Sequence, residues 1–581
     1  MKKILTVLAL LLTVLALLLA VLLTFSACTQ GTGDTASSAD ADDSVAVTVN
    51  EADYFSDRDR SGAWDESKAV SITLNGNSAA CDGSGVEIDG SVVTITAEGV
   101  YVLSGTLDDG CIVVNATKDE KVQLVLDGVT ITSSGFAPIY VKQADKVFVT
   151  LADGSLNTLT NGGSFTAIDE NDVDAVIFSK DDLTLNGTGS LIVNSPAGHG
   201  VVGKDEVTIT GGSYEITAAK TAISANDVLA VADGAFQLTA GTNGMRAKND
   251  DAGLGNIYLA GGSFKVTADG DGISATGTLT VAGGSFTVIS GASGSDSSAS
   301  QKGLKSGGTL TVSDGTIWVV STDDAIHSDS SVTIANGTLN LSSGDDGIHA
   351  DETVTISGGS IVINRSYEGI EGLVIRISGG EIDLTASDDG LNAGGGADSS
   401  GFGGWGGDRF GENSSASLEI SGGVLRVYAD GDGLDSNGSF TLSGGEVYVS
   451  GPTNDGNGAL DYSSGTVTGG SLVATGSGGM ALNFNSATQG AILLSVGTQA
   501  AGSTVTLTDE SGSVILTYTA EKAFNAVNLT SPALLQGGTY TVTAGTYSET
   551  LTLSELLYGS AAGMGSRGGF GGNMGGGRGH P

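Results

Sequence analysis

Short alternations of apolar and polar residues recur along most of the chain. In DDGIHADETVTISGGSIVIN, from Asp345 to Asn364, the alternation predicts three strands, over 347–350, 353–357 and 360–364. Gly358-Gly359 supplies the corner between the last two strands, since glycine adopts a positive φ at little cost. A unit this small cannot bury its own apolar face, so it needs copies stacked above and below it.

The chain supplies these copies. The corner glycines Gly315, Gly337 and Gly359 recur every 22 residues, which lies within the range of stacked repeats. The repeats contain three strand patterns each and no helical pattern. They predict an all-β fold, a right-handed parallel β-helix of about 22 residues per coil, in which each strand pairs with coils about 4.8 Å away.

The pattern changes at both ends of the repeats and divides the chain into segments. Lys2-Lys3 and the apolar run that follows predict an export segment. The expected segments are the export segment at 1–27, a flexible tether at 28–69, an N-terminal β cap at 70–107, the β-helix at 108–489 with an insertion at 394–415, a small antiparallel β cap or sandwich at 490–557, and a disordered Gly-rich tail at 558–581.

The export segment ends in Phe25-Ser26-Ala27-Cys28, which resembles a lipoprotein signal with Cys28 as the lipidated residue. Its apolar run of about 20 residues is also long enough to remain as a membrane anchor. Either alternative places most of the chain on the extracellular face of the membrane. In that oxidising compartment, Cys81 and Cys111 are candidates for a disulfide.

The charge balance restricts the partners. The chain has 66 acidic and 24 basic residues and a formal net charge of −42. Nucleic acids and anionic lipids would be repelled, so membrane contact is expected only through the N-terminal anchor. The charge is compatible with cations, and with polyanions where a cation bridges them. The alternative is that the charge only keeps the surface solvated.

Acidic residues recur at fixed offsets from the Ile or Leu that begins each coil. Two positions before this aliphatic residue stand Asp271, Lys302, Asp324, Asp346, Glu368, Asp389 and Asp432. One position earlier stand Asp323, Asp345 and Asp388, and one position after it stand Ser274, Lys305, His327, His349, Glu371, Asn392 and Asp435. Parallel stacking predicts that these residues form a file of carboxylates about 4.8 Å apart, here called the acidic file.

Like charges at this spacing repel by about 1 kcal/mol per neighbouring pair in water and by more at a protein surface. Ca²⁺ is a suitable compensator because it accepts six to eight oxygen ligands in loose geometry. The predicted ligands are Asp271, Asp323, Asp324, Asp345, Asp346, Glu368, Glu371, Asp388, Asp389, Asp430, Asp432 and Asp435. The alternative is that Asp-Asp-Gly forms ordinary turns, with the carboxylates capping backbone N–H groups.

Two lysines interrupt the acidic file. Lys302 and Lys305 occupy both offsets in one coil, where salt bridges to the neighbouring acids are the first expectation. A sharper alternative is that they bind a sugar carboxylate, or that one of them is the base that removes the proton α to a uronate carboxyl group.

The insertion at 394–415 is too rich in glycine to belong to the stacked core. It carries Phe402, Trp405 and Phe410, whose rings are expected on the surface, where they can stack on sugar faces. The alternative is an insertion whose rings lie against the β-helix.

The repeated [DE]-[DE]-G-[IL] units, the motif GVYVLSGTLDDG at Gly99 and the stretch from Asp430 to Tyr462 resemble a known family. It is the family of carbohydrate-binding, polysaccharide-lyase-like parallel β-helix proteins of bacterial cell surfaces. The resemblance implies calcium-dependent binding of plant cell-wall polysaccharides such as cellulose and polygalacturonate, with the acids of the file as ligands. It also implies a catalytic lysine, a role that only Lys302 or Lys305 could fill here.

We therefore expect an extracytoplasmic, surface-anchored, monomeric protein that binds polysaccharide with calcium. One alternative is a calcium-dependent pectate-type lyase that acts by β-elimination. Another is a structural adhesin without a small-ligand site.

Overall fold

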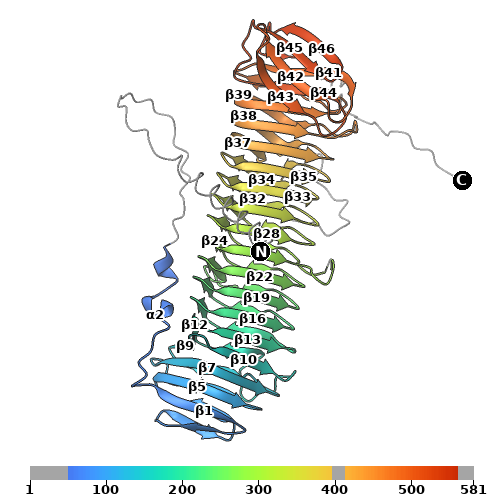
Figure 1. Cartoon of the computed structure of the whole chain (residues 1–581). Helices are drawn as coiled ribbons and strands as arrows, with labels where there is room; N and C mark the ends of the chain where they lie inside the picture. Colours follow the sequence, from blue (N-terminus) through green and yellow to red (C-terminus); the bar gives the residue numbers. More distant parts are fainter. Residues whose placement is uncertain (1–49, 297, 395–412, 560–581) are drawn as a thin grey trace, which may run out of the picture. The chain divides into compact units, whose positions relative to one another are not determined.

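The computed structural model describes residues 50–296, 298–394 and 413–559 and consists almost entirely of β-strands (Figure 1). The strands stack in parallel as a solenoid of about 15 turns, from β1 (Val70–Gly76) near one end to β39 (Leu460–Gly476) near the other. The predicted parallel β-helix is confirmed.

Each coil contributes strands to three files. The first file carries the acidic residues and contains β6 (Cys111–Asn115), β8 (Ile139–Gln143), β11 (Ala175–Ser179), β14 (His199–Gly203), β17 (Ile223–Ala225), β20 (Met245–Ala247), β23 (Ile273–Ala275), β26 (Leu304–Ser306), β29 (Ile326–Ser328) and β36 (Leu391–Ala393). The second contains β9 (Lys146–Leu151), β12 (Asp182–Gly187), β15 (Glu206–Ile209), β18 (Val228–Val231), β21 (Asn256–Leu259), β24 (Leu279–Val281), β27 (Leu310–Val312) and β30 (Ser331–Ile334).

The third file contains β10 (Leu156–Asn161), β13 (Ser190–Ser195), β16 (Ser213–Ala218), β19 (Ala235–Ala240), β22 (Ser263–Ala268), β25 (Ser285–Ile289), β28 (Thr316–Val320), β31 (Thr338–Ser342), β33 (Ser360–Ser366) and β35 (Glu381–Ala386). Longer strands take part in more than one file. They are β7 (Lys121–Ser133), β32 (Ile348–Ile356), β34 (Ile370–Ile377), β37 (Ser417–Ala429), β38 (Leu434–Ser450) and β39.

Inward-pointing aliphatic and aromatic side chains fill the solenoid. In the third file, Tyr214, Phe236, Phe264 and Phe286 stack with ring centroids 5.1, 4.7 and 4.6 Å apart. At the corner before the third file, Gly359 has φ of 89°, and an added Cβ would lie 2.9 Å from the carbonyl oxygen of Gly337. Only glycine fits this corner without strain, which explains the periodic glycines of the sequence.

Antiparallel pairs occur at both ends of the described solenoid. At the N-terminal end, β1 pairs with β2 (Ala79–Cys81), β3 (Val86–Asp89) pairs with β4 (Val92–Ile95), and β5 (Gly99–Leu107) continues in parallel from β1. The short helices are η1 (Glu51–Asp53) and α2 (Asp57–Arg60), and the buried carboxylate of Asp59 on α2 accepts a hydrogen bond from Thr184.

The predicted antiparallel region at the C-terminal end is confirmed. Its four-stranded sheet has the order β43 (Val514–Thr519), β42 (Thr504–Asp509), β45 (Thr539–Ala544) and β46 (Tyr547–Thr552). It is joined to the solenoid through β44 (Phe524–Thr530), which pairs antiparallel with both β39 and β41 (Ala491–Gln499). Two short strands, β40 (Ser486–Ala487) and β47 (Leu557–Tyr558), complete the set.

Some sequence predictions fall outside the described residues. They concern Cys28 and the rings Phe402, Trp405 and Phe410. Within the described part, no helix is long and apolar enough to cross a membrane. Cys81 and Cys111 are free thiols in the structure, so the candidate disulfide is absent. Cys111 is buried in a separate small apolar cluster, where burial raises its thiol pKa to about 11.

Candidate functional site

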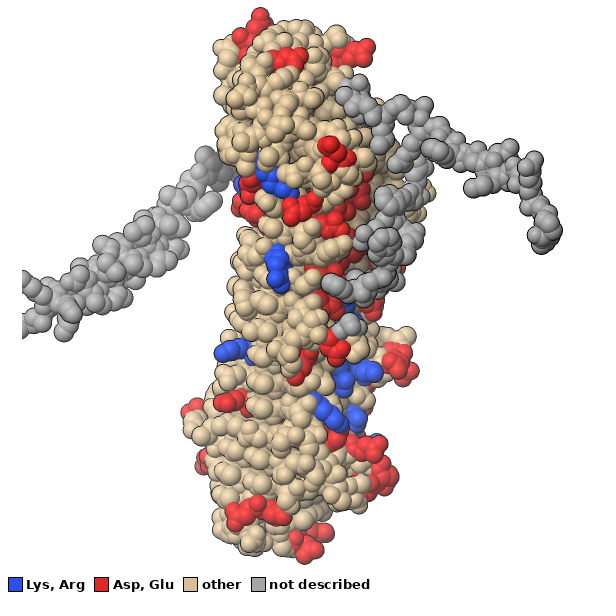
Figure 2. Space-filling view, turned by 90° about the vertical axis from the view of Figure 1, so that its right-hand side faces the viewer, with Lys and Arg blue, Asp and Glu red and all other residues tan. Residues whose placement is uncertain are grey.

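The predicted register of the first file is observed. The strands align Ile273 with Leu304, then with Ile326, Ile348, Ile370, Leu391, Leu434 and Leu460. The acids at fixed offsets from these residues therefore lie above one another. Figure 2 shows acidic side chains gathered in one vertical zone of the face it presents. Several members are buried rather than splayed into solvent, among them Asp324 and Asp346.

The acids also cap the turns, as the alternative reading predicted. Asp324 accepts a hydrogen bond through Oδ1 from the backbone N–H of Asp346 at 3.0 Å, and Asp346 accepts one from Glu368 at 3.2 Å. Asp389 accepts from the N–H of Asp432 at 2.6 Å. The acids therefore cap turns and also lie close to one another. One carboxylate oxygen accepts a hydrogen bond from the backbone of the neighbouring coil, and the second oxygen can bind another partner.

Lys302 supplies that partner for two acids. Its side chain is 6% exposed, and Nζ lies 3.0 Å from Asp323 Oδ1 and 2.6 Å from Asp324 Oδ2. Burial alone would raise the pKa of Asp324, but its hydrogen bond with His327 and the charge of Lys302 hold it well below its ordinary value. The predicted salt bridges of Lys302 are confirmed by this geometry.

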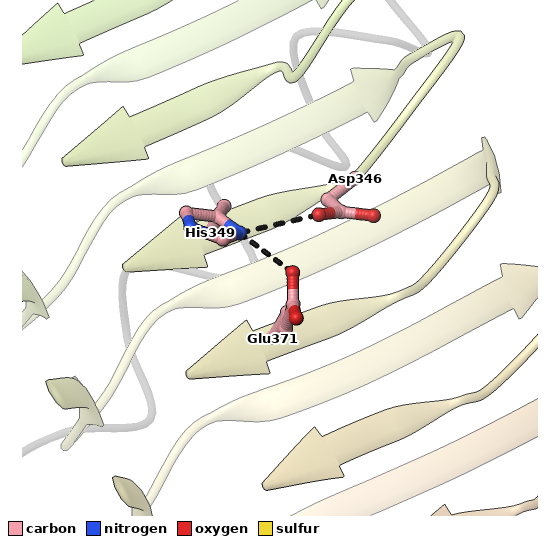
Figure 3. A group of neighbouring side chains, drawn as sticks. All are labelled: Asp346, His349 and Glu371. Atoms are coloured by element: carbon pink, nitrogen blue, oxygen red, sulfur yellow. Dashed lines mark hydrogen bonds and ion pairs between the residues drawn. The ribbon is translucent and has the colours of Figure 1, made fainter. Parts of the chain in front are cut away.

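Two stacked histidines also pair with carboxylates of the acidic file. The rings of His327 and His349 lie 4.9 Å apart, and Nδ1 of His349 lies 2.7 Å from Glu371 Oε2 and 3.3 Å from Asp346 Oδ2 (Figure 3). Burial alone would lower the pKa of His349, but the hydrogen bonds to Asp346 and Glu371 outweigh it and raise the pKa to about 12. The other ring nitrogen, Nε2, lies 3.2 Å from Asp351 Oδ1, so both nitrogens of His349 face carboxylates, an arrangement that suits a protonated ring.

We call the part of the file from Lys302 to Glu371 the cation-filled section. His327 extends it, with Nδ1 2.8 Å from Asp324 and Nε2 2.8 Å from Asp329. Three cationic or cation-forming side chains, Lys302, His327 and His349, alternate here with carboxylates. This section neutralises much of its own charge.

The next coils lack such cations at the same offsets. We call Asp388, Asp389, Asp432, Asp435 and Asp461 the acid-only section. Ligand oxygens of Asp432, Asp435 and Asp461 lie within 4.8 Å of one another. Burial, together with the neighbouring carboxylates, raises the pKa of Asp389 to about 8, of Asp435 to about 7 and of Asp432 to about 6.

The donor set of the acid-only section suits a hard divalent cation. All three grouped side chains, Asp432, Asp435 and Asp461, offer carboxylate oxygen and no thiolate or imidazole, which favours Ca²⁺ over zinc or copper. The pKa values of Asp389, Asp432 and Asp435 are raised because burial and the like charge of neighbouring carboxylates disfavour the charged form. Two further groups, Asp323–Asp324–Asp345 and Asp346–His349–Glu371, have similar spacing but contain or contact the internal cations.

The other predicted site residues lie apart from these groups. Asp430 pairs with Lys522 at 2.6 Å. Asp271 accepts hydrogen bonds from Asn243 at 3.2 Å and Ser300 at 2.7 Å. Lys305 is half-buried, and its Nζ donates to Ser300 Oγ at 3.2 Å. These contacts give Asp271 and Asp430 partners of their own outside the acid-only section.

Sequence reasoning missed Asp461. Its coil begins with Gly458-Ala459-Leu460 instead of the Asp-Gly-Leu step, so the acid-based alignment ended one coil too early. The signal was present, because Leu460 is followed by an acid just as Leu434 is followed by Asp435. The internal role of His349 was also missed, since sequence position does not show which carboxylates its ring meets.

The raised carboxyl pKa values predict that the calcium-free protein loses stability as pH rises from about 4 to 8. Below its own raised pKa, each of Asp389, Asp432 and Asp435 retains in the folded protein a proton that the unfolded chain has released, so unfolding releases protons. Each such group contributes up to about 1.4 kcal/mol per pH unit. His349 acts in the same direction above about pH 6.5, as its folded pKa is raised.

Urea unfolding of chelator-treated protein at pH 5 and pH 8 measures this effect. The midpoint should be lower at pH 8. An equal or higher midpoint at pH 8 would show that these carboxyl groups are not held protonated by the fold.

Comparison with known proteins found similarity to carbohydrate-binding proteins over part of the chain. Residues 89–347 match the family model of carbohydrate-binding domain-containing proteins. A carbohydrate-binding domain-containing protein of Acetivibrio thermocellus is 41% identical over 136 residues, which are 23% of this chain and 48% of that protein. The match thus spans about half the length of this curated relative.

A solved structure, described as the polysaccharide lyase-like protein from C. thermocellum in a gadolinium derivative, is similar with a TM-score of 0.36. It is 28% identical, and the match covers 50% of this chain and 96% of the other. The carbohydrate-binding part of the resemblance predicted from the sequence agrees with the family model over residues 89–347 and with this relative, whereas the description as polysaccharide lyase-like belongs to the solved structure alone.

Proposed function

We propose that the protein is an extracytoplasmic, surface-anchored polysaccharide-binding protein that uses calcium. The observation that supports it most is the acid-only section, where Asp432, Asp435 and Asp461 bring ligand oxygens within 4.8 Å of one another. The family match of residues 89–347 supports carbohydrate as the ligand class. Plant cell-wall glycans such as cellulose and polygalacturonate are the proposed partners.

Calcium has a definite task in this proposal. Asp432, Asp435 and Asp461, with Asp388 and Asp389 below them, would hold the ion. Bound there, calcium neutralises the section and accepts further oxygen ligands, including the carboxylates of a uronate polymer. Without the ion, a net charge of −42 repels such a polymer.

A pull-down of the full chain on insoluble cellulose and on calcium-depleted pectate, with calcium or with chelator, tests the proposal. We expect retention in calcium and a large loss on pectate in chelator. The variant Asp435→Asn should be lost from pectate in calcium, whereas the exposed third-file variant Glu215→Gln should be retained. Retention of neither polysaccharide in either condition would favour a structural adhesin instead.

The lyase alternative now depends on one residue. Lys302 is buried with its ammonium on two carboxylates, so it is not placed to take a proton from a substrate. Lys305, which is half-buried and donates a hydrogen bond to the hydroxyl of Ser300, is the remaining candidate base. Appearance of unsaturated product absorbance with polygalacturonate, and its loss in Lys305→Ala, would favour the lyase.

A further inference from the structure

A second charged feature lies on the same edge of the solenoid, before the acidic file begins. Arg246 on β20 stands one position after the first-file residue Met245, the same offset that carries Lys305 and His327 further along. Its register partners in the coils below and above are Ser224 and Ser274. Two short hydroxyl side chains, and no acid, therefore occupy the same offset in the coils next to Arg246.

Arg246 lacks an acidic partner among the residues that the structure describes. Its hydrogen bond joins Nη2 to Ser224 Oγ at 3.4 Å, and its Nε is buried without a hydrogen-bond partner. Asp174, which interacts electrostatically with it, is held by Lys220 at 2.7 Å and faces His199 at 3.4 Å.

The unsatisfied hydrogen-bond donor of Arg246 destabilises the folded protein unless an acceptor binds the guanidinium. A buried donor without an acceptor costs about 1–3 kcal/mol, and burial lowers the pKa of this guanidinium, which shows that its charge is poorly solvated. An apolar side chain at this position would avoid the cost. The acid in the following coil, Asp271, does not relieve it, since its oxygens take hydrogen bonds from Asn243, Ser300 and the N–H of Lys302.

Lys305 is a second cation at the same offset, two coils further along the solenoid. The register runs from Arg246 through Ser274 to Lys305, which corresponds to about 9.6 Å along the stack. Nζ of Lys305 contacts the hydroxyl of Ser300, and no ion pair joins it to an acid within the described ranges. Figure 2 shows basic groups on the same side as the acidic zone and below it.

We propose that Arg246 and Lys305 form an anion-binding subsite that holds oxyanion groups of a polysaccharide directly, without calcium. The shared chemistry is a carboxylate or a sulfate ester, two of which can lie about 10 Å apart on one saccharide chain and meet both cations. The inference rests on the proposed polysaccharide-binding function and adds to it a second contact, in which fixed cations of the protein meet negative groups of the ligand without calcium. A single chain along this edge would meet fixed cations first and the acid-only section later.

Calorimetric titration of chelator-treated full chain tests the subsite. The probes are trigalacturonate, a sulfated trisaccharide of the same length, and neutral cellotriose. We expect at least one anionic probe to bind and cellotriose to bind more weakly, and Arg246→Gln to weaken the anionic probe about 10-fold, because hydrogen bonds to charged groups are lost. Arg426→Gln, which removes an exposed ion pair with Glu381, is the matched control and should bind as the wild type does.

The two anionic probes identify the source of the charge, since the tighter one indicates a uronate or a sulfated glycan. If Arg246→Gln does not fold, Lys305→Gln carries the same expectation. If Arg246→Gln, Lys305→Gln and the control Arg426→Gln bind the anionic probes with equal affinity, the proposed subsite is overturned. It is also overturned if neither anionic probe binds in chelator. In that case retention of polysaccharide in calcium would show that the proposed function still stands, whereas loss of all binding in calcium would overturn both.

Discussion

Removing calcium at pH 8 is expected to lower the free energy of unfolding by about 4 kcal/mol relative to protein in calcium at a thousand times its Kd. The physical reason lies in the acid-only section, where Asp389, Asp432 and Asp435 are half-buried close to other carboxylates and their pKa values are raised. A cation that binds only the folded protein relieves this repulsion. Thermal or urea unfolding at fixed protein concentration, in calcium and in chelator, measures the difference.

The substitution Asp435→Asn is expected to change the free energy of unfolding in opposite directions with and without calcium. In chelator, Asp435→Asn is expected to stabilise the protein at pH 8, since it removes a charge that the fold disfavours. In calcium, the same variant should be less stable than the wild type, because it removes a ligand. Glu215→Gln, on the exposed surface of the third file, should leave both values unchanged. A variant that moves stability in the same direction under both conditions would contradict calcium binding at Asp435.

Replacing Lys302 by methionine is expected to destabilise the protein by about 3–5 kcal/mol, whether or not calcium is present. The ammonium is the cation nearest the buried carboxylate of Asp324, at 2.6 Å, and its removal leaves that carboxylate with an ion pair to His327 and a backbone hydrogen bond. Lys121→Met removes a salt bridge of similar length, 2.9 Å to Asp145, at an exposed site. It should cost no more than about 1 kcal/mol.

The double variant Lys302→Met with Asp324→Asn separates two explanations for that loss. If the loss comes from an unpaired buried charge, the second substitution should recover part of it. If Lys302 acts through the packing of its aliphatic stem, the second substitution should add to the loss. A Lys302→Met variant no less stable than Lys121→Met would show that the cation-filled section is not held together by this ion pair.

The fold was predictable because each level of the sequence agrees with it. The 22-residue period, the corner glycines such as Gly359 and the Ile or Leu that begins each coil all specify one register, and the strands pair in that register. The position of Lys302 beside Asp324 followed from the same alignment. The register of the strands alone determines which side chains at a fixed offset lie above one another. The acidic file could therefore be predicted from the sequence.

The division of the file was not predictable from the sequence. Whether an acid is neutralised depends on side-chain direction across coils, as when His349 reaches Glu371 in the next coil and Asp346 in its own. Arg246 was overlooked for a related reason: the alignment began from coils that carry acids, and the coil of Arg246 has Asn243 at the acidic offset. The sequence shows which residues share an edge, but not which of them lack a partner.

The most direct measurement of the central claim is an anomalous difference map from crystals of the full chain grown in calcium. A peak bounded by carboxylate oxygens of Asp432, Asp435 and Asp461 is the result that this account predicts. Crystals that bind calcium elsewhere, or that show only water between these three carboxylates at saturating calcium, would contradict it.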